Sequence, residues 1–148
     1  MKIQMNKTYN FEIKNASFGD IPQSRMNELY TDGRLAAFAL EEQLVYWFPE
    51  LTRIEGNKDH DHVDVQGRKY DAKNFTKNGG NCRPSNMRGQ GRKFDPEIAH
   101  MKAALLRYIF CDILDFPRVR VKFVEGSDFV QQYPSCLLPK GQREVFFG

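Results

Sequence analysis

Residues 62–75, HVDVQGRKYDAKNF, decide the fold of this 148-residue chain, because they predict two β-strands joined by a tight turn. Gly67 supplies the permissive backbone that a Gln66-Gly67 turn needs. We therefore expect a hairpin whose strands cover residues 59–65 and 68–76.

The second strand of this hairpin contains Asp71-Ala72-Lys73. Residues two apart in a strand point to the same face, so Asp71 and Lys73 project together. If Asp64 lies on the neighbouring strand, its carboxylate can approach that of Asp71, and two converging carboxylates repel unless a divalent cation lies between them. Mg²⁺ suits such a site, because it takes oxygen ligands and keeps waters and substrate phosphate oxygens for the rest. The alternative is an ordinary surface strand on which Asp71 and Lys73 pair with each other, worth less than about 1 kcal/mol.

The flanking segments predict an alternation of helices and strands. Apolar residues have helical spacing over residues 24–48, and Pro49 ends the pattern. Because Gly33 weakens the middle, this segment forms either one long helix or two shorter helices. Asp95-Pro96-Glu97 begins another helix, which is expected to continue to about Leu114. That helix would bury Ile98, Met101, Leu105, Tyr108, Ile109 and Cys111. Further strands are expected at residues 8–14, 51–55, 118–124 and 143–147, and the order from 24 to 124 is helix, three strands, helix, strand.

A basic segment follows the hairpin. Residues 66–93 contain eight cations and one anion, Asp71, whereas the whole chain has a net charge of only +3. A segregated positive field fits a polyanionic partner, although a solvated basic loop would show the same charges. Residues 77–95 hold four glycines and a proline and are expected to form a long, mobile loop. The cations expected to contact nucleic acid there are Lys77, Arg83, Arg88, Arg92 and Lys93.

The composition bounds the class of protein. With 41% hydrophobic residues, 148 residues can form one domain with its own core, and the sequence shows no repeat or linker that would divide residues 1–148. No run approaches the roughly 20 apolar residues of a membrane span, and the first residues lack the apolar stretch of a secretory signal. Three cysteines without C-x-x-C spacing predict free thiols, so we expect a cytoplasmic or otherwise intracellular protein without a membrane partner.

Residues 62–65 followed by 70–75 resemble the PD-(D/E)xK nuclease superfamily, the restriction-endonuclease-like enzymes. The resemblance implies an α/β fold with a mixed central sheet flanked by helices, whose α-β-β-β-α-β core covers residues 24–124. It implies that Asp64 and Asp71 are metal ligands and that Lys73 is the catalytic lysine. The backbone carbonyl of Ala72 is a further expected ligand. The chain departs from the family pattern in lacking a proline before Asp64, which leaves Asp61 as an alternative to Asp64, and in having Asp at position 71.

Many members of that superfamily add an acidic residue from the first helix. At 100° per residue, the apolar arc of residues 36–48 includes Glu41 and leaves out Glu42. A glutamate on the buried side of a helix needs a partner, which a metal site would supply; otherwise Glu41 reaches solvent from the edge of the arc. His60, His62 and Asp64 alternate, which permits a transition-metal site as well as an ordinary polar strand end.

These expectations define a metal-dependent endonuclease that hydrolyses phosphodiester bonds, with DNA favoured over RNA. Mg²⁺ would be the cofactor, with Mn²⁺ able to replace it, and Lys73 would orient or deprotonate the attacking water. Cutting both strands of a duplex would favour a homodimer. Two alternatives stay open: a nucleic-acid-binding protein without catalysis, and a structural or assembly protein of a virus.

Overall fold

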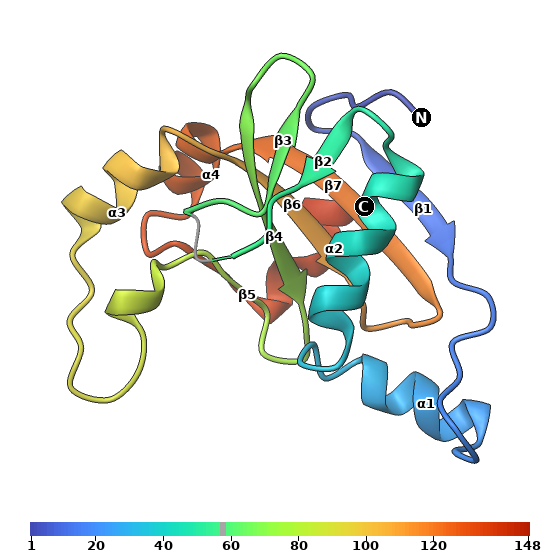
Figure 1. Cartoon of the computed structure of the whole chain (residues 1–148). Helices are drawn as coiled ribbons and strands as arrows, with labels where there is room; N and C mark the ends of the chain where they lie inside the picture. The colour runs from blue at the N-terminus through green and yellow to red at the C-terminus, as the bar shows by residue number, and fades with distance from the viewer. Residues whose placement is uncertain (57–58) are drawn as a thin grey trace.

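A six-stranded mixed sheet forms the centre of the computed structural model, which describes residues 1–56 and 59–148 (Figure 1). Its strands follow the order β1-β7-β6-β4-β3-β2, in which β4 and β6 are parallel and all other neighbours are antiparallel. The strands are β1 (Thr8–Glu12), β2 (Leu51–Arg53), β3 (His62–Asp64), β4 (Lys69–Phe75), β6 (Arg107–Asp112) and β7 (Arg118–Glu125). A second, two-stranded sheet pairs β5 (Gly80–Asn81) with β8 (Leu137–Leu138).

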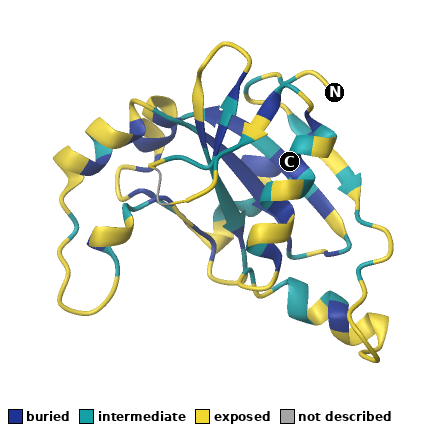
Figure 2. Ribbon diagram, in the orientation of Figure 1, coloured by how far each residue is buried: buried dark blue, intermediate teal, exposed yellow. Residues whose placement is uncertain are grey.

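Helices pack against both faces of the large sheet. They are α1 (Gln23–Tyr30), α2 (Ala36–Trp47), α3 (Pro96–Ala103), α4 (Gly126–Gln132) and α5 (Arg143–Phe147), with single 3₁₀ turns at η1 (Ser85–Met87) and η2 (Lys140–Gln142). One hydrophobic cluster joins α2 to Tyr70 and Ile109, and the other joins α3, α4 and α5 to Phe75 and Phe110. We call these sides of the sheet the α2 face and the α3 face. Figure 2 shows the central strands buried between them.

Several predicted elements are confirmed, and so is the mixed α/β class. The helical pattern of residues 24–48 forms two helices, with Gly33 between them at a φ of 91°. A Cβ at Gly33 would lie 2.9 Å from the Thr76 side chain, so this link passes too close to the end of β4 for a larger residue. Asp95 caps α3 by accepting a hydrogen bond from the N–H of Ile98 (3.3 Å).

The helix predicted over residues 95–114 is wrong in its second half. Helix α3 ends at Ala103, and residues 107–112 form β6. Four consecutive residues of this strand, 108–111, are at most 3% exposed, because β6 lies between β4 and β7 and both its faces are covered. A strand buried on both faces has no polar alternation, and a short apolar run of this kind is easily mistaken for a buried helix. Ile98, Met101 and Leu105, expected in the core, are exposed.

Two other expectations need correction. Residues 143–147 form helix α5 in place of a strand, with Phe146 and Phe147 buried against the α3 face. Residues 77–95 are not one irregular loop, because they contain β5 and η1. The packed structure also extends beyond residues 24–124, since β1 pairs with β7 and α4 and α5 complete the core of the α3 face.

Candidate active site

Residues 65–68 join β3 to β4, and the Asp64 N–H donates to the Arg68 carbonyl (3.0 Å). This hydrogen bond leaves three residues, 65–67, in the turn, where the sequence predicted a two-residue turn. Gly67 completes it with a φ of 83°, the left-handed conformation typical of three-residue hairpin loops. The additional residue pairs His62 with Tyr70 and shifts β3 by one position relative to β4. A shift of one residue moves every side chain of a strand to the opposite face.

This register places Asp64 on the α2 face, away from Asp71. The Asp64 side chain has no exposed surface and accepts hydrogen bonds from the N–H groups of Gln66 (2.9 Å) and Arg68 (3.0 Å). It also accepts from Arg68 Nε (2.7 Å) and from the Tyr70 hydroxyl (2.8 Å). Asp64 therefore stabilises the turn, which corrects the expectation that its carboxylate approaches Asp71.

The carboxyl group that does reach Asp71 belongs to Asp61. Asp61 immediately precedes β3, and its carboxyl group is hydrogen-bonded to that of Asp71. As predicted, Asp71 and Lys73 share a face, with Lys73 Nζ 3.1 Å from Asp71 Oδ2 and both side chains about four-fifths buried. The structure thus brings Asp61, Asp71 and Lys73 together on the α3 face.

The electrostatics of this cluster centre on Asp71. Burial raises the pKa of Asp71 to about 6, because the carboxylate loses solvation there. Lys73 lowers that pKa, whereas the hydrogen bond with Asp61 and the proximity of its charge raise it. Asp71 therefore keeps its proton up to about pH 6, and a divalent cation beside it would favour release of that proton.

Ala72 lies where β3 separates from β4. The N–H of Asp61 donates to the Tyr70 carbonyl (2.9 Å), and Asp61 Oδ2 accepts from the Ala72 N–H (2.9 Å). The Asp61 side chain thus takes the place of a backbone carbonyl as the acceptor for the Ala72 N–H. The N–H and C=O of one strand residue point to the same edge of the strand. The Ala72 carbonyl therefore lies on the edge of β4 that faces β3, at a position where β3 no longer pairs with β4.

A cavity of about 540 Å³ adjoins the carboxyl pair, and we call it the carboxylate cavity. Asp59, Asp61 and Asp71 line it together with five cationic side chains and an apolar wall. The cations are Lys69, Lys73, Arg83, Arg88 and Lys102, and the wall includes Ala99, Leu105, Leu106 and Tyr108. Of the lining residues, sequence patterns predict a role in the site for Asp71, Lys73, Arg83 and Arg88, and none for Lys69, Lys102 or Tyr108.

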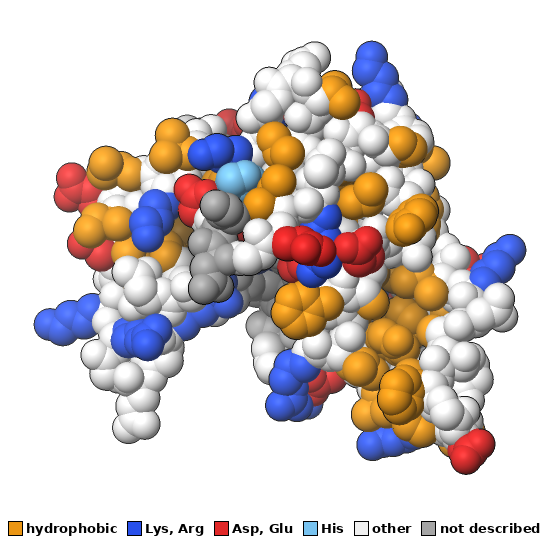
Figure 3. Space-filling model, in the orientation of Figure 1, with side chains coloured by type: hydrophobic (Ala, Val, Ile, Leu, Met, Phe, Trp, Pro, Cys, Tyr) orange, Lys and Arg blue, Asp and Glu red, His pale blue; other side chains and the backbone are white. Residues whose placement is uncertain are grey.

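The polypeptide from η1 to α3, residues 85–103, forms an arm beside the sheet (Figures 1 and 3). Its arginines bond mainly to backbone carbonyls. Arg88 donates to the carbonyls of Arg83 (2.7 Å) and Asn81 (3.1 Å), and Arg92 donates to that of Ser85 (2.9 Å). The predicted nucleic-acid-binding residues Arg88 and Arg92 therefore hold the arm together.

Arg83 anchors the base of this arm. Its Nε donates to the carbonyl of Ser135 (2.9 Å), and its guanidinium lies 4.1 Å from the centre of the Phe94 ring. The two remaining predicted contacts, Lys77 and Lys93, are exposed.

Glu41 lies on α2 and has an ion-pair partner. Its carboxylate is 3.1 Å from Arg53 Nη2, and Glu42 is 2.9 Å from Arg53 Nη1. The partner that a half-buried glutamate needs is thus an arginine, and the structure does not bring Glu41 to Asp71. The neighbouring His62 is buried, with Nε2 2.8 Å from the Glu41 carbonyl, and burial lowers its pKa.

His60 contacts Asp59 (2.7 Å) and lies outside β3, so the alternating histidines do not share one site with Asp64. Within residues 1–56 and 59–148, no three side chains of Asp, Glu, His or Cys lie close enough to hold a metal ion by themselves. A site at Asp61 and Asp71 would need water or substrate oxygens as additional ligands.

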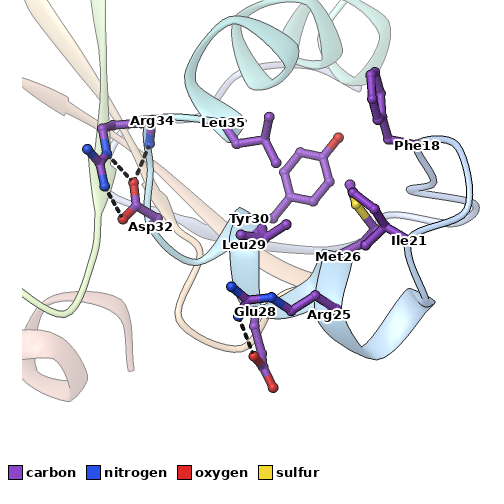
Figure 4. Close-up of a pocket in the computed structure, with 10 residues that line it drawn as sticks. All are labelled: Phe18, Ile21, Arg25, Met26, Glu28, Leu29, Tyr30, Asp32, Arg34 and Leu35. Atoms are coloured by element: carbon purple, nitrogen blue, oxygen red, sulfur yellow. Dashed lines mark hydrogen bonds and ion pairs between the residues drawn. The ribbon is translucent and has the colours of Figure 1, made fainter.

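A separate cavity of about 660 Å³ lies beside α1, with an apolar lining (Figure 4). Phe18, Ile21, Met26, Leu29, Tyr30 and Leu35 contribute to it. Its charged residues pair with each other, since Arg25 bonds Glu28 (2.9 Å) and Arg34 bonds Asp32 (2.6 Å). It has no carboxyl pair of the kind that Asp61 and Asp71 form.

Two expectations about the whole chain can be compared with the structure. Cys82, Cys111 and Cys136 are free and buried, as predicted. In the described part of the chain, no helix is long and apolar enough to cross a membrane.

Comparisons of the chain with known protein families, curated proteins and solved structures found no match.

Proposed function

We propose that this protein is a metal-dependent nuclease whose site is formed by Asp61, Asp71 and Lys73. The observation that carries the proposal is the hydrogen-bonded pair of carboxyl groups beside a lysine, in a cavity lined by four further cations. A phosphodiester is the substrate class that uses both features, since its phosphate oxygens require cations and its hydrolysis requires activated water.

The residues fit a Mg²⁺ ion. Mg²⁺ commonly binds through one or two carboxylates and keeps its other positions for water and substrate phosphate, which Asp61 and Asp71 allow. The Ala72 carbonyl, on the edge of β4 that Asp61 occupies, would be a third ligand. The ion would supply Lewis-acid stabilisation of the phosphate, and Mn²⁺ would replace it.

The chain's own side chains would position the substrate. Lys73, held by Asp71, would direct its ammonium group toward the attacking water or the phosphate oxygens. Lys69 and Lys102, both exposed at the rim, would contact neighbouring phosphates. Apolar side chains, including Leu106 and Tyr108, form part of the cavity lining.

The order of elements supports a restriction-endonuclease-like fold as part of this proposal. Helix α2 precedes the meander β2-β3-β4, and α3 leads to β6, which pairs in parallel with β4. This is the α-β-β-β-α-β order that the sequence resemblance implies, with Asp61 in the place first given to Asp64. On a duplex, cleavage of both strands would require a symmetric dimer.

A protein that binds nucleic acid without cleaving it is the second candidate. The observation in its favour is the ion pair of Lys73 with Asp71, which satisfies both groups without any metal. Metal-dependent hydrolysis of a phosphodiester would distinguish a nuclease from a protein that only binds nucleic acid.

The test is hydrolysis of the small diester bis(p-nitrophenyl) phosphate and of single- and double-stranded DNA, with Mg²⁺ or Mn²⁺ and with chelator. We expect metal-dependent hydrolysis that falls at least about 100-fold in Asp71→Asn and in Lys73→Gln, while the exposed control Asp20→Asn keeps wild-type rates. Equal rates with chelator, or full activity in Asp71→Asn, would show that the assigned site is not catalytic.

A further inference from the structure

A second cavity, of about 520 Å³, lies along β4 next to the carboxylate cavity. Its lining combines three asparagines and two glycines with an apolar part formed by Ala37, Ala72 and residues 137–139, and we call it the amide cavity. Asn74, Asn78, Asn81, Gly79 and Gly80 contribute, and Ala37 of α2 closes one side. Among the residues that the structure describes, its lining contains two cations, Lys73 and Arg88, and no carboxylate.

The two cavities share Lys73 and Arg88. Both side chains are held in place, since Lys73 bonds Asp71 (3.1 Å) and Arg88 donates to the Arg83 and Asn81 carbonyls. The cavities therefore adjoin each other at the proposed catalytic lysine. They also meet at the edge of β4 that β3 has left, where the Ala72 and Asn74 backbones lack a strand partner from β3.

We propose that the amide cavity binds the nucleotides on one side of the scissile phosphate, so that a single polynucleotide strand passes through both cavities. This inference rests on the proposed function, because it takes the cleaved bond to lie at Asp61, Asp71 and Lys73. Each cavity has the volume of a small-ligand pocket, which suits nucleotides of one strand and not a complete duplex.

The chemistry of the amide cavity favours a nucleic acid over a peptide strand. Lys73 and Arg88 supply positive charge for a phosphate, Lys73 while paired with Asp71 and Arg88 while bonded to backbone carbonyls. Asparagine amides both donate and accept hydrogen bonds at base edges. A peptide could pair with the exposed edge of β4, but it would not use Lys73 and Arg88 unless it were acidic.

The test measures binding without cleavage. A fluorescently labelled single-stranded oligonucleotide of about 12 nucleotides is titrated with protein at low salt in chelator, and anisotropy is recorded. Ala37→Glu places a negative charge in the amide cavity and should weaken binding at least about tenfold. Ala39→Glu is the matched control, since Ala39 lies on the same helix, is exposed and lines neither cavity, and its affinity should stay within about twofold of wild type.

Asn78→Asp is a second variant that changes charge with almost no change in shape, at an exposed turn, so that a folding defect of Ala37→Glu would not decide the result. It should weaken binding in the same direction, with an unchanged circular-dichroism spectrum. Equal affinities of wild type and both cavity variants would overturn the proposal. So would a wild-type protein that does not bind the oligonucleotide, or one from which duplex DNA displaces it more effectively than unlabelled single strand.

The small diester keeps this test separate from that of the proposed function. Its hydrolysis needs only the carboxyl pair and Lys73, so metal-dependent turnover with unaltered oligonucleotide binding in the variants would refute the amide cavity alone. Selective loss of oligonucleotide binding in the variants, without any metal-dependent turnover, would refute the catalytic assignment.

Discussion

Asp64 accepts four hydrogen bonds around the β3–β4 turn, whereas Asp61 directs its carboxyl group to Asp71 on the other face of the sheet. The Tyr70 hydroxyl connects Asp64 to Arg107, 3.0 Å away, and burial raises the pKa of Tyr70 to about 12. Asp64 thus belongs to a buried polar network, in which the loss of one partner leaves others without an acceptor.

Replacing the two aspartates should have different consequences. Asp64→Ala should lower the free energy of unfolding by about 1–3 kcal/mol, because the buried Tyr70 hydroxyl and the turn N–H groups lose their acceptor. Asp61→Asn should keep most of the stability and lose Mg²⁺ binding. Urea denaturation and Mg²⁺ titration measure the two effects, and a stable Asp64→Ala variant without Mg²⁺ affinity would reverse the assignment of the two residues.

The raised pKa of Asp71, about 6, predicts opposite effects of pH on stability and on metal binding. The folded state binds this proton more tightly than the unfolded chain, so its contribution to stability is present at low pH and is lost as pH rises through about 6. Without metal, wild type should lose stability relative to Asp71→Asn between pH 5 and pH 8, while Mg²⁺ affinity of wild type rises over the same range. Thermal unfolding at both pH values, with and without Mg²⁺, measures this, and parallel curves for the two proteins would contradict it.

At the scale of elements, the arm and β4 share the cations of the carboxylate cavity. Arg88 and Arg92 hold the arm through backbone carbonyls, and Arg83 holds it to Ser135. Replacing these arginines would therefore disturb structure and charge together. Lys69 at the start of β4 and Lys102 in α3 are exposed and line the cavity, which makes them better probes of phosphate contact.

Lys69→Gln combined with Lys102→Gln should weaken the binding of single-stranded DNA and reduce its salt dependence. Each lost phosphate contact should lower the slope of log K against log salt by about 0.7 for a single strand, so the double variant should lose about 1.4. The control is Lys2→Gln with Lys140→Gln, two exposed lysines that line neither cavity. Identical slopes for both double variants would mean that the rim lysines do not contact phosphate.

At the scale of the whole molecule, the proposed site lies where three distant segments meet. The hairpin provides Asp61 and Asp71, the arm provides Arg88 and Lys102, and residues 137–139 complete the amide cavity. The carboxyl pair forms only in the folded hairpin, whose strand β4 pairs with β6 at the centre of the sheet, so an ion bound by the pair should stabilise the whole fold.

Mg²⁺ should therefore raise the melting temperature. An ion that binds only the folded state at 100 times its dissociation constant contributes about 2.7 kcal/mol. Calorimetry should show this shift in wild type and in Asp20→Asn, and its absence in Asp71→Asn. An equal shift in all three proteins would place the Mg²⁺ ion elsewhere.

Local patterns alone determined much of this protein. The alternation in β4 was sufficient to predict that Asp71 and Lys73 share a face, and Gly33 and Asp95-Pro96 correctly marked the ends of helices. These features depend on residues within a few positions of each other, whose backbone preferences act in any surroundings.

Only the tertiary structure decided which aspartate lies beside Asp71, and that residues 107–112 form a strand. One additional turn residue, Val65, placed Asp61 instead of Asp64 on the face of Asp71, because side chains alternate faces along a strand. Residues 107–112 form a strand because they pair with β4 on one side and β7 on the other. Arg83 donates to the carbonyl of Ser135, which is 52 residues away in the chain. Register and burial are set by contacts between segments far apart in the chain, and no local pattern specifies them.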